Sequence, residues 1–378
     1  MKKIQMVDLI TQYQAISKEI KIEFDSILES GAFINGPAVS QFEQILSEYL
    51  EVKHVIGCAN GTDALQIALM ALNFDPGDEI ITTNFTFAAT VEVIYLLGLK
   101  PILVDIDPNT FNIDLTKIKE HLTDKTKAIM PVHLFGRVCQ MDKITDLAKE
   151  HDLVIIEDNA QSIGARYNHP RLGQKAAGTL GEFGTTSFFP AKNLGAYGDG
   201  GALFTNDDSL ARQARTIANH GMSRRYYHDY IGVNSRLDTF QAAVLKIKLN
   251  HLDTYIQKRR ESAIEYGNLL NDIPEIILPN FPKQDEEHVW HQYTIRILNG
   301  KRDQLGQHLK LSGIPYGIYY PIPLHKQKAY MSEEFSDEQF PITNTFSKQV
   351  LSLPMHSELT NQQIKFITDS IREFFLRK

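Results

Sequence analysis

The chain has 378 residues, of which 43% are hydrophobic and 22% charged, a composition typical of a globular protein rather than a disordered one. Its 39 basic and 46 acidic side chains give a net charge of −7, which argues against nucleic-acid binding and against attachment to a membrane surface. The two cysteines, Cys58 and Cys139, form no CxxC pair, so we expect neither a disulfide framework nor a metal site.

The first residues do not resemble a targeting signal. The segment MKKIQMVDLITQYQAI begins with basic residues, but Asp8, Gln12 and Gln14 interrupt the apolar core that a signal peptide requires. No stretch approaches the roughly 18 apolar residues of a membrane span. We therefore expect a soluble protein in the cytoplasm.

Short apolar segments alternate with helical patterns through the first half of the chain. The segments expected to be strands are 54–57, 78–82, 101–104, 128–132 and 153–156, and the helical patterns between them include 64–72 and 91–97. This alternation predicts an α/β fold, with a mostly parallel sheet and helices on both faces. Ligands of such sheets bind beyond the carboxyl ends of the strands.

The second half of the chain differs in character. Residues 183–206 are rich in Gly, Thr and aromatic side chains, which predicts short strands joined by tight turns. A charged helical pattern over about 237–270 predicts a long connecting helix that is bent or broken. Strand-like HQYTIRIL and a helix that ends at Gly313 follow. We expect two domains, a large one of residues 1–249 with an N-terminal helix and a small one of residues 250–378.

Three segments carry residues that suggest chemistry, and the first is CANGTDAL at 58–65. A predicted strand leads there into Gly61, Thr62 and Asp63, which begin a helix. The unpaired amides and the dipole of a helix start favour an anion such as phosphate, and Thr62 adds a hydroxyl donor. The alternative is that Thr62 or Asp63 only caps the helix.

The second and third segments each offer one ionisable side chain. Asp158, in IIEDNAQ, follows an apolar strand, where a carboxylate can hold a cationic ring nitrogen or a metal, or cap the next helix. Lys192 lies in SFFPAKNLGAYGDGG, among apolar and aromatic residues beside a glycine-rich turn. Desolvation lowers the pKa of a lysine, and the neutral amine can form a Schiff base. The alternative is an ordinary surface lysine.

Together the three segments fit one cofactor, pyridoxal 5'-phosphate (PLP). PLP requires an anion site for its phosphate, an acid that keeps its ring nitrogen protonated and a lysine for a Schiff base. Glycine-rich turns let the backbone approach such a group closely. No GxSxG, GK[ST] or HExxH motif competes with this interpretation, and GAYGDGG is not a dinucleotide-binding GxGxxG after a strand.

Four motifs resemble the DegT/StrS family of nucleotide-sugar aminotransferases: GTDAL at 61–65, EDNAQSIGA at 157–165, SFFPAKNLGAYGDGGALFTND at 187–207 and NSRLDTFQAAVL at 234–245. The likeness extends from VDL at 7–9 to SLPMH at 352–356, and the motifs occur in the order of the family. The resemblance implies the fold-type I aminotransferase architecture, PLP as cofactor and a homodimer whose active sites lie at the subunit interface.

The resemblance also implies roles for individual residues. Lys192 would be the Schiff-base lysine and Asp158 the acid at the pyridine nitrogen. The remaining cofactor contacts implied are Gly61, Thr62, the amide of Asp63 and Ser187 at the phosphate, Gln161 at the ring hydroxyl, Phe87 stacked on the ring, and Asn234 from the partner subunit at the phosphate. Because Lys192 is not replaced by histidine, the sugar dehydratases of the family are disfavoured.

Within the family, CANGTDALQI, RRYYHDYIGVNSRLD and YYPIPLHKQ resemble enzymes that aminate carbon 3 of a keto sugar. The substrate implied is UDP-2-acetamido-2-deoxy-3-oxo-glucuronate, with L-glutamate as amino donor, for surface polysaccharides such as lipopolysaccharide. Arg236, together with Arg224, Arg225 and His228, could supply positive charge for the carboxylate or diphosphate.

The segment YYPIPLH carries the other expected substrate contacts. We expect Tyr319, Tyr320 and His325 to line the sugar site, although such Pro-aromatic segments often only pack loops.

Several alternatives stay open. NSRLD also occurs in relatives that act on dTDP-3-keto-6-deoxyhexoses, so Arg236 does not settle the substrate. A non-catalytic PLP-binding regulator, a PLP enzyme of free amino acids and a plain nucleotide-sugar binding protein are further possibilities.

Overall fold

The centre of the computed structural model, which describes residues 3–284 and 287–376, is a seven-stranded sheet of order β1-β9-β8-β5-β4-β2-β3. The strands are β1 (His54–Cys58), β2 (Glu79–Thr83), β3 (Lys100–Val104), β4 (Thr126–Met130), β5 (Val154–Asp158), β8 (Phe183–Ser187) and β9 (Gly201–Thr205). Neighbours are parallel from β8 to β3, while β9 runs antiparallel to β1 and β8. The predicted mostly parallel sheet is confirmed.

Helices cover both faces of this sheet, as predicted. They are α2 (Pro37–Leu50), α3 (Gly61–Leu72), α4 (Ala89–Leu96), α5 (Leu115–Glu120), α6 (Met141–Glu150), α7 (Asp208–Ala218) and α8 (Thr239–Leu249). Alternate strand residues point to opposite faces. Ile81 and Ile155 pack in one core with α2, α6 and α8, whereas Ile80 and Ile156 pack in another with α3, α4 and α7.

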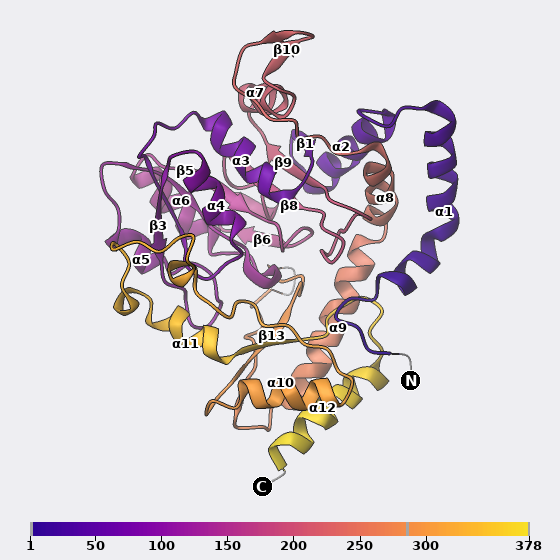
Figure 1. The fold of residues 1–378 in the computed structure, drawn as a ribbon, viewed down its shortest axis with the longest axis vertical. Coiled ribbons are helices and arrows are strands. Elements are labelled where there is room, and N and C mark those ends of the chain that lie inside the picture. The colour runs from indigo at the N-terminus through magenta and orange to yellow at the C-terminus, as the bar shows by residue number, and fades with distance from the viewer. Residues whose placement is uncertain (1–2, 285–286, 377–378) are drawn as a thin grey trace.

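Helix α1 (Leu9–Ser30) lies along one side of the molecule, against α8 (Figure 1). The side chain of Asp8 caps its first turn by accepting from the amide of Thr11 at 2.9 Å, and Gly31, with φ 67°, ends it. Ile16 and Ile20 face α8, while Ile22 is 61% exposed.

The expected long helix after residue 237 is broken at Asn250 and His251, and α9 (Leu252–Leu270) runs from there toward the opposite end of the molecule (Figure 1). A further core, the C-terminal core, lies at that end. Its elements after α9 are β12 (Ile276–Ile277), β13 (Tyr293–Ile297), β14 (Val350–Leu353), α10 (Arg302–Leu311) and α12 (Asn361–Leu376), and α11 (Pro341–Gln349) precedes β14. Ile4 also joins this core. We propose the break at Asn250 as the domain boundary.

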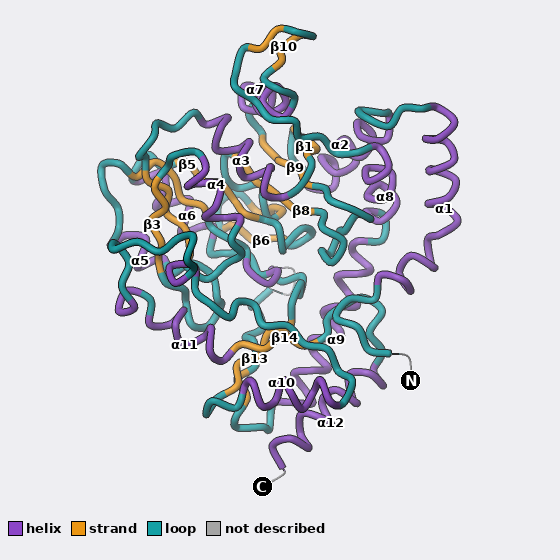
Figure 2. Tube along the Cα trace, in the orientation of Figure 1, coloured by secondary structure: helices purple, strands orange, loops and turns teal. Residues whose placement is uncertain are grey.

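Loops occupy much of the region between the seven-stranded sheet and the C-terminal core (Figure 2). The remaining strands are the pairs β6 (Arg166–His169) with β7 (Gly173–Ala176) and β10 (Met222–Arg224) with β11 (Tyr227–His228), and the second pair projects from the molecule beyond α7 (Figure 1). Within residues 3–284 and 287–376, no helix is long and apolar enough to cross a membrane.

Candidate active site

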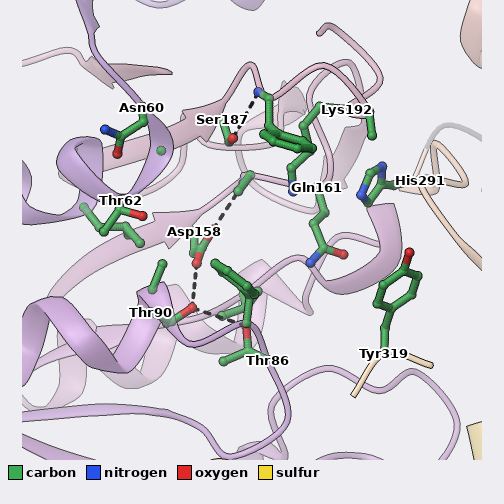
Figure 3. A pocket seen from close by; sticks show the side chains of 18 of the residues that line it. Asn60, Thr62, Thr86, Thr90, Asp158, Gln161, Ser187, Lys192, His291 and Tyr319 are labelled. Atoms are coloured by element: carbon green, nitrogen blue, oxygen red, sulfur yellow. Dashed lines mark hydrogen bonds between the residues drawn. The ribbon is translucent and has the colours of Figure 1, made fainter. Parts of the chain in front are cut away.

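A cavity of about 840 Å³ opens at the carboxyl ends of the central strands. Asp158 is the last residue of β5, Ser187 is the last residue of β8, and α3 begins at Gly61. Because β5 and β8 are parallel neighbours, their ends meet at one edge of the sheet, where ligands of such sheets bind. Figure 3 shows side chains from these elements around one space.

The start of α3 forms a cradle for an anion. The first amides of a helix have no partner within it. Asn60 Oδ1 accepts from the amide of Asp63 at 2.8 Å, so the amides of Gly61 and Thr62 are left for a ligand beside the Ser187 hydroxyl. A Cβ at Gly61 would lie 2.7 Å from the Cβ of Ser187, so only glycine allows this close approach. The expected contact from the Asp63 amide is therefore taken by Asn60 here.

Asp158 presents a buried carboxylate in a fixed orientation. Its side chain accepts from the Thr90 hydroxyl at 2.8 Å and from the amide of Ala160 at 3.2 Å. A second hydroxyl, that of Thr86, lies 3.2 Å from the Thr90 hydroxyl and extends this chain of contacts (Figure 3). A carboxylate can accept about four hydrogen bonds, so Asp158 retains capacity for a ring N–H in the cavity.

Lys192 reaches the same cavity from a tight loop. Its amide donates to the carbonyl of Phe189 at 2.8 Å, and Lys248, buried in α8, donates from Nζ to the carbonyl of Gly195 at 2.5 Å. Burial lowers the pKa of Lys192 to about 8, against a smaller opposing effect of Asp158. The amine is therefore neutral far more often than a surface lysine, which suits a nucleophile.

Gln161 is oriented by the protein. Its Oε1 accepts from the amide of Phe135 at 2.8 Å and its Nε2 donates to the hydroxyl of Tyr320 at 3.2 Å. The amide nitrogen has a second hydrogen, which is left for a ligand. Tyr319 and Phe87 line the same cavity, and Phe87 is 59% exposed.

Six predicted residues do not line this cavity within the chain, and three of them, Arg224, Arg225 and His228, lie in or beside the projecting pair of β10 and β11. Asn234 is exposed at an isolated bridge to Asn219, and Arg236 lies in a separate groove of about 290 Å³. His325 is buried, with Nδ1 2.6 Å from Asn84 Nδ2 and Nε2 3.1 Å from Asp337 Oδ1.

Sequence reasoning missed three residues that the structure places around the cavity. Asn60 follows the end of β1 and could have been found as a polar residue at that position, whereas Thr90 lies in the first turn of α4, seven residues beyond the end of β2. His291 had no local signal, because it lies 99 residues from Lys192 in the chain.

The cavity fits PLP. Lys192 would hold its aldehyde carbon, Asp158 its ring nitrogen, Gln161 its ring oxygen, and the start of α3 with Ser187 its phosphate. The close approach at Gly61 is the clearest structural sign of the anion cradle, since a Cβ would fill it. On this sheet, such a site defines a PLP-dependent enzyme of fold type I.

Comparison with known proteins narrows this class. The model of the DegT/DnrJ/EryC1/StrS aminotransferase family matches residues 14–372. The chain is 46% identical to the pleiotropic regulatory protein of Geobacillus stearothermophilus, over 98% of each chain. It is 44% identical to the UDP-2-acetamido-2-deoxy-3-oxo-D-glucuronate aminotransferase of Pseudomonas aeruginosa, over 96% of this chain and 98% of the relative. The crystal structure of DesV from S. venezuelae aligns over 100% of both chains, with a TM-score of 0.94 and 37% identity.

The chain belongs to the DegT/DnrJ/EryC1/StrS aminotransferase family. It is a PLP-dependent sugar aminotransferase with the fold-type I architecture, which confirms the fold, the class of enzyme and the cofactor predicted from the sequence. Its reaction requires a sugar substrate and an amino donor.

Proposed function

We propose that this chain transfers an amino group from L-glutamate to carbon 3 of a nucleotide-linked keto sugar. The observation that carries the proposal is the meeting of Lys192, Asp158 and the anion cradle of α3 in one cavity. When bound, PLP supplies an electron-withdrawing ring and an aldehyde that carries the amino group between the two substrates.

Each cavity residue then has a definite task. Lys192 Nζ would hold the cofactor's aldehyde carbon and, when free of it, would be placed to move a proton at the α-carbon of the donor. Asp158 holds a proton on the ring nitrogen, and Thr90 keeps its carboxylate turned toward that atom. The amides of Gly61 and Thr62 and the hydroxyls of Thr62 and Ser187 hold the phosphate, so the ring cannot shift during the transfer.

The sugar we favour is UDP-2-acetamido-2-deoxy-3-oxo-glucuronate. Its support is the 44% identity to a transaminase named for that substrate, together with the resemblance noted for the segments that contain NSRLD and YPIPLH. A dTDP-3-keto-6-deoxyhexose is the alternative, since NSRLD also occurs in enzymes of those sugars. The regulator alternative has support from the names of two relatives, but a regulator has no need of a nucleophilic lysine beside a ring-nitrogen acid.

We propose that the working unit is a homodimer. Phe87 and Phe189 both line the cavity yet are 59% and 54% exposed, so one chain leaves the mouth of its cavity open. Asn234 and Arg236 lie outside their own chain's cavity, which is compatible with action in that of a second copy.

The test uses the purified, PLP-loaded protein with 2-oxoglutarate and two amino sugars in separate reactions. One is UDP-linked 2-acetamido-3-amino-2,3-dideoxyglucuronate and the other a dTDP-3-amino-6-deoxyhexose. Formation of L-glutamate from the UDP sugar acid supports the proposal. Turnover of the dTDP sugar alone keeps the transaminase and overturns the substrate, and no amino exchange with either sugar or with glutamate favours the regulator.

A further inference from the structure

His291 lines the cavity but has no task in the cofactor site described above. It lines the cavity with Lys192 and Tyr319, and its side chain lies on the same side as theirs (Figure 3). Its Nδ1 is buried without a hydrogen-bond partner among the described residues, and Nε2 is the ring nitrogen left to the cavity.

The backbone that presents His291 is tied to the loop of the proposed catalytic lysine. Asn193, the neighbour of Lys192, donates from Nδ2 to the carbonyl of Val289 at 2.9 Å. Trp290, between Val289 and His291, has φ 50°, a left-handed conformation that is rare for a bulky residue. Backbone strain of this kind persists where the surroundings hold it, and it clusters at functional sites.

Arg259 places a positive charge behind His291. It is 3% exposed, and its Nη1 donates to the carbonyls of Trp290 (3.2 Å), His291 (3.4 Å) and Met355 (3.0 Å). Burial lowers the pKa of Arg259 to about 10, so it stays charged at neutral pH. No carboxylate pairs with it among the residues that the structure describes. A buried cation without a counter-ion favours an anion nearby.

The wall of the cavity offers few other groups for an anionic donor. Among the described residues that line it, the carboxylates are Asp63, Asp158 and Asp199, and no arginine is present. Lys192 is required at the donor's α-carbon, so the α-carboxylate, bonded to that carbon, must come to rest close to it. Burial and the neighbouring cations of Lys192 and Arg259 keep the pKa of His291 well below its usual value. The ring is therefore a neutral hydrogen-bond donor.

We propose that His291 donates a hydrogen bond from Nε2 to the α-carboxylate of the amino-acid donor, with the Arg259 charge behind it. This inference rests on the proposed transaminase function. It makes His291 specific to one of the two half-reactions, because the keto sugar carries no carboxylate on the carbon that accepts the amino group.

The experiment measures the two half-reactions separately by the cofactor's visible absorbance: L-glutamate with the PLP form, and the keto sugar with the aminated form. The variants are His291→Leu, which removes the donor, and His291→Gln, which keeps an N–H. His151→Leu, at the exposed end of α6, is the control. We expect His291→Leu to raise the apparent Kd for L-glutamate roughly 10- to 100-fold, the range for a hydrogen bond to a charged group.

His291→Gln should recover part of that loss, and the apparent Kd for the sugar should stay within about threefold in both variants. Equal losses in both half-reactions, or unchanged glutamate binding, overturns the inference. If His291→Leu does not fold, the test uses His291→Gln instead. The change in its apparent Kd for L-glutamate is then compared with the change in its apparent Kd for the keto sugar. If the wild-type protein exchanges no amino group, the proposed function itself is contradicted, whatever the variants show.

Discussion

The hydroxyl of Thr90, in the first turns of α4, donates to Oδ2 of Asp158, at the end of β5, over 2.8 Å. Helix and strand are thus linked through the side chain proposed to hold the cofactor's ring nitrogen. Thr86, whose hydroxyl lies 3.2 Å from that of Thr90, extends the link into the loop that carries Phe87.

Replacing Thr90 by valine should therefore reduce activity more than stability. Valine keeps the shape but removes the donor, so the Asp158 carboxylate is free to turn away from the ring nitrogen. We expect kcat to fall about 10-fold, while Thr90→Ser keeps most of the activity. Steady-state kinetics at saturating cofactor measure both, and a Thr90→Val enzyme as fast as wild type would remove the positioning role.

Removing the amine of Lys192 should abolish transamination and yet stabilise the apoprotein. Burial lowers the pKa of Lys192 from 10.5 to about 8. Between these values the unfolded chain binds a proton that the folded chain does not, so stability rises with pH across that window. Below pH 8 the folded state carries the full penalty, roughly 3 kcal/mol.

The comparison is between apo wild type and Lys192→Met. The variant should have the larger free energy of unfolding at pH 7, and the difference should shrink as the pH rises from 8 toward 10.5. Urea denaturation at several pH values measures it. If the difference in free energy of unfolding did not change with pH, the protonated form of Lys192 would not be destabilised by burial, and the argument would be wrong.

Glu157, the neighbour of Asp158, should matter for folding more than any exposed acid nearby. It is fully buried and accepts from His133 Nε2 (2.9 Å) and from the amides of Gly178 (2.9 Å), Leu180 (2.6 Å) and Gly181 (2.8 Å). In Glu157→Gln, the NH₂ group faces N–H donors and cannot accept from them. The free energy of unfolding should fall by about 2–4 kcal/mol.

Glu182→Gln is the matched control for this loss. The exposed Glu182 accepts one amide, that of Ile155, at 2.7 Å, and its change should lower the free energy of unfolding by less than about 1 kcal/mol. Urea denaturation compares the two, and equal losses would contradict the argument from burial.

The local patterns predicted most of the fold because burial and periodicity coincide in it. Ile80 and Ile81, or Ile155 and Ile156, divide between two cores as alternate residues of buried strands must. Asp158 and Gly61 could be assigned because strand ends and helix starts mark ligand positions in such sheets, whereas Ser187 was assigned through the family resemblance.

The features of the site that the sequence did not predict depend on contacts between segments that are distant in the chain. The amide of Asp63 can donate either to a bound phosphate or to the side chain of Asn60. In the structure it donates to Asn60, and residue spacing alone does not distinguish the two acceptors. The backbone around His291 is held at the cavity by hydrogen bonds from Asn193 and Arg259, which are distant in the sequence. His325 belongs to the same motif as Tyr319 and Tyr320, but the two tyrosines line the cavity and His325 does not.

His325 instead joins the YYPIPLH segment to the end of β2. Its ring lies 2.6 Å from Asn84 Nδ2, and its amide donates to Asn84 Oδ1 at 3.0 Å. Tyr320, five residues earlier, meets Gln161 in the cavity. We infer that Asn84 and His325 act as a pair that positions the tyrosine and do not touch the sugar themselves.

A double-mutant cycle distinguishes this role from the expected sugar contact. Asn84→Ala and His325→Ala should each raise KM for the nucleotide sugar by about 3- to 10-fold, and together by little more than Asn84→Ala alone, because Asn84→Ala already removes the ring contact that His325→Ala breaks. Asp337→Asn, at the exposed partner of His325, should have a smaller effect. If His325 instead bound the sugar, its loss would multiply with that of Asn84, and the pairing would be refuted.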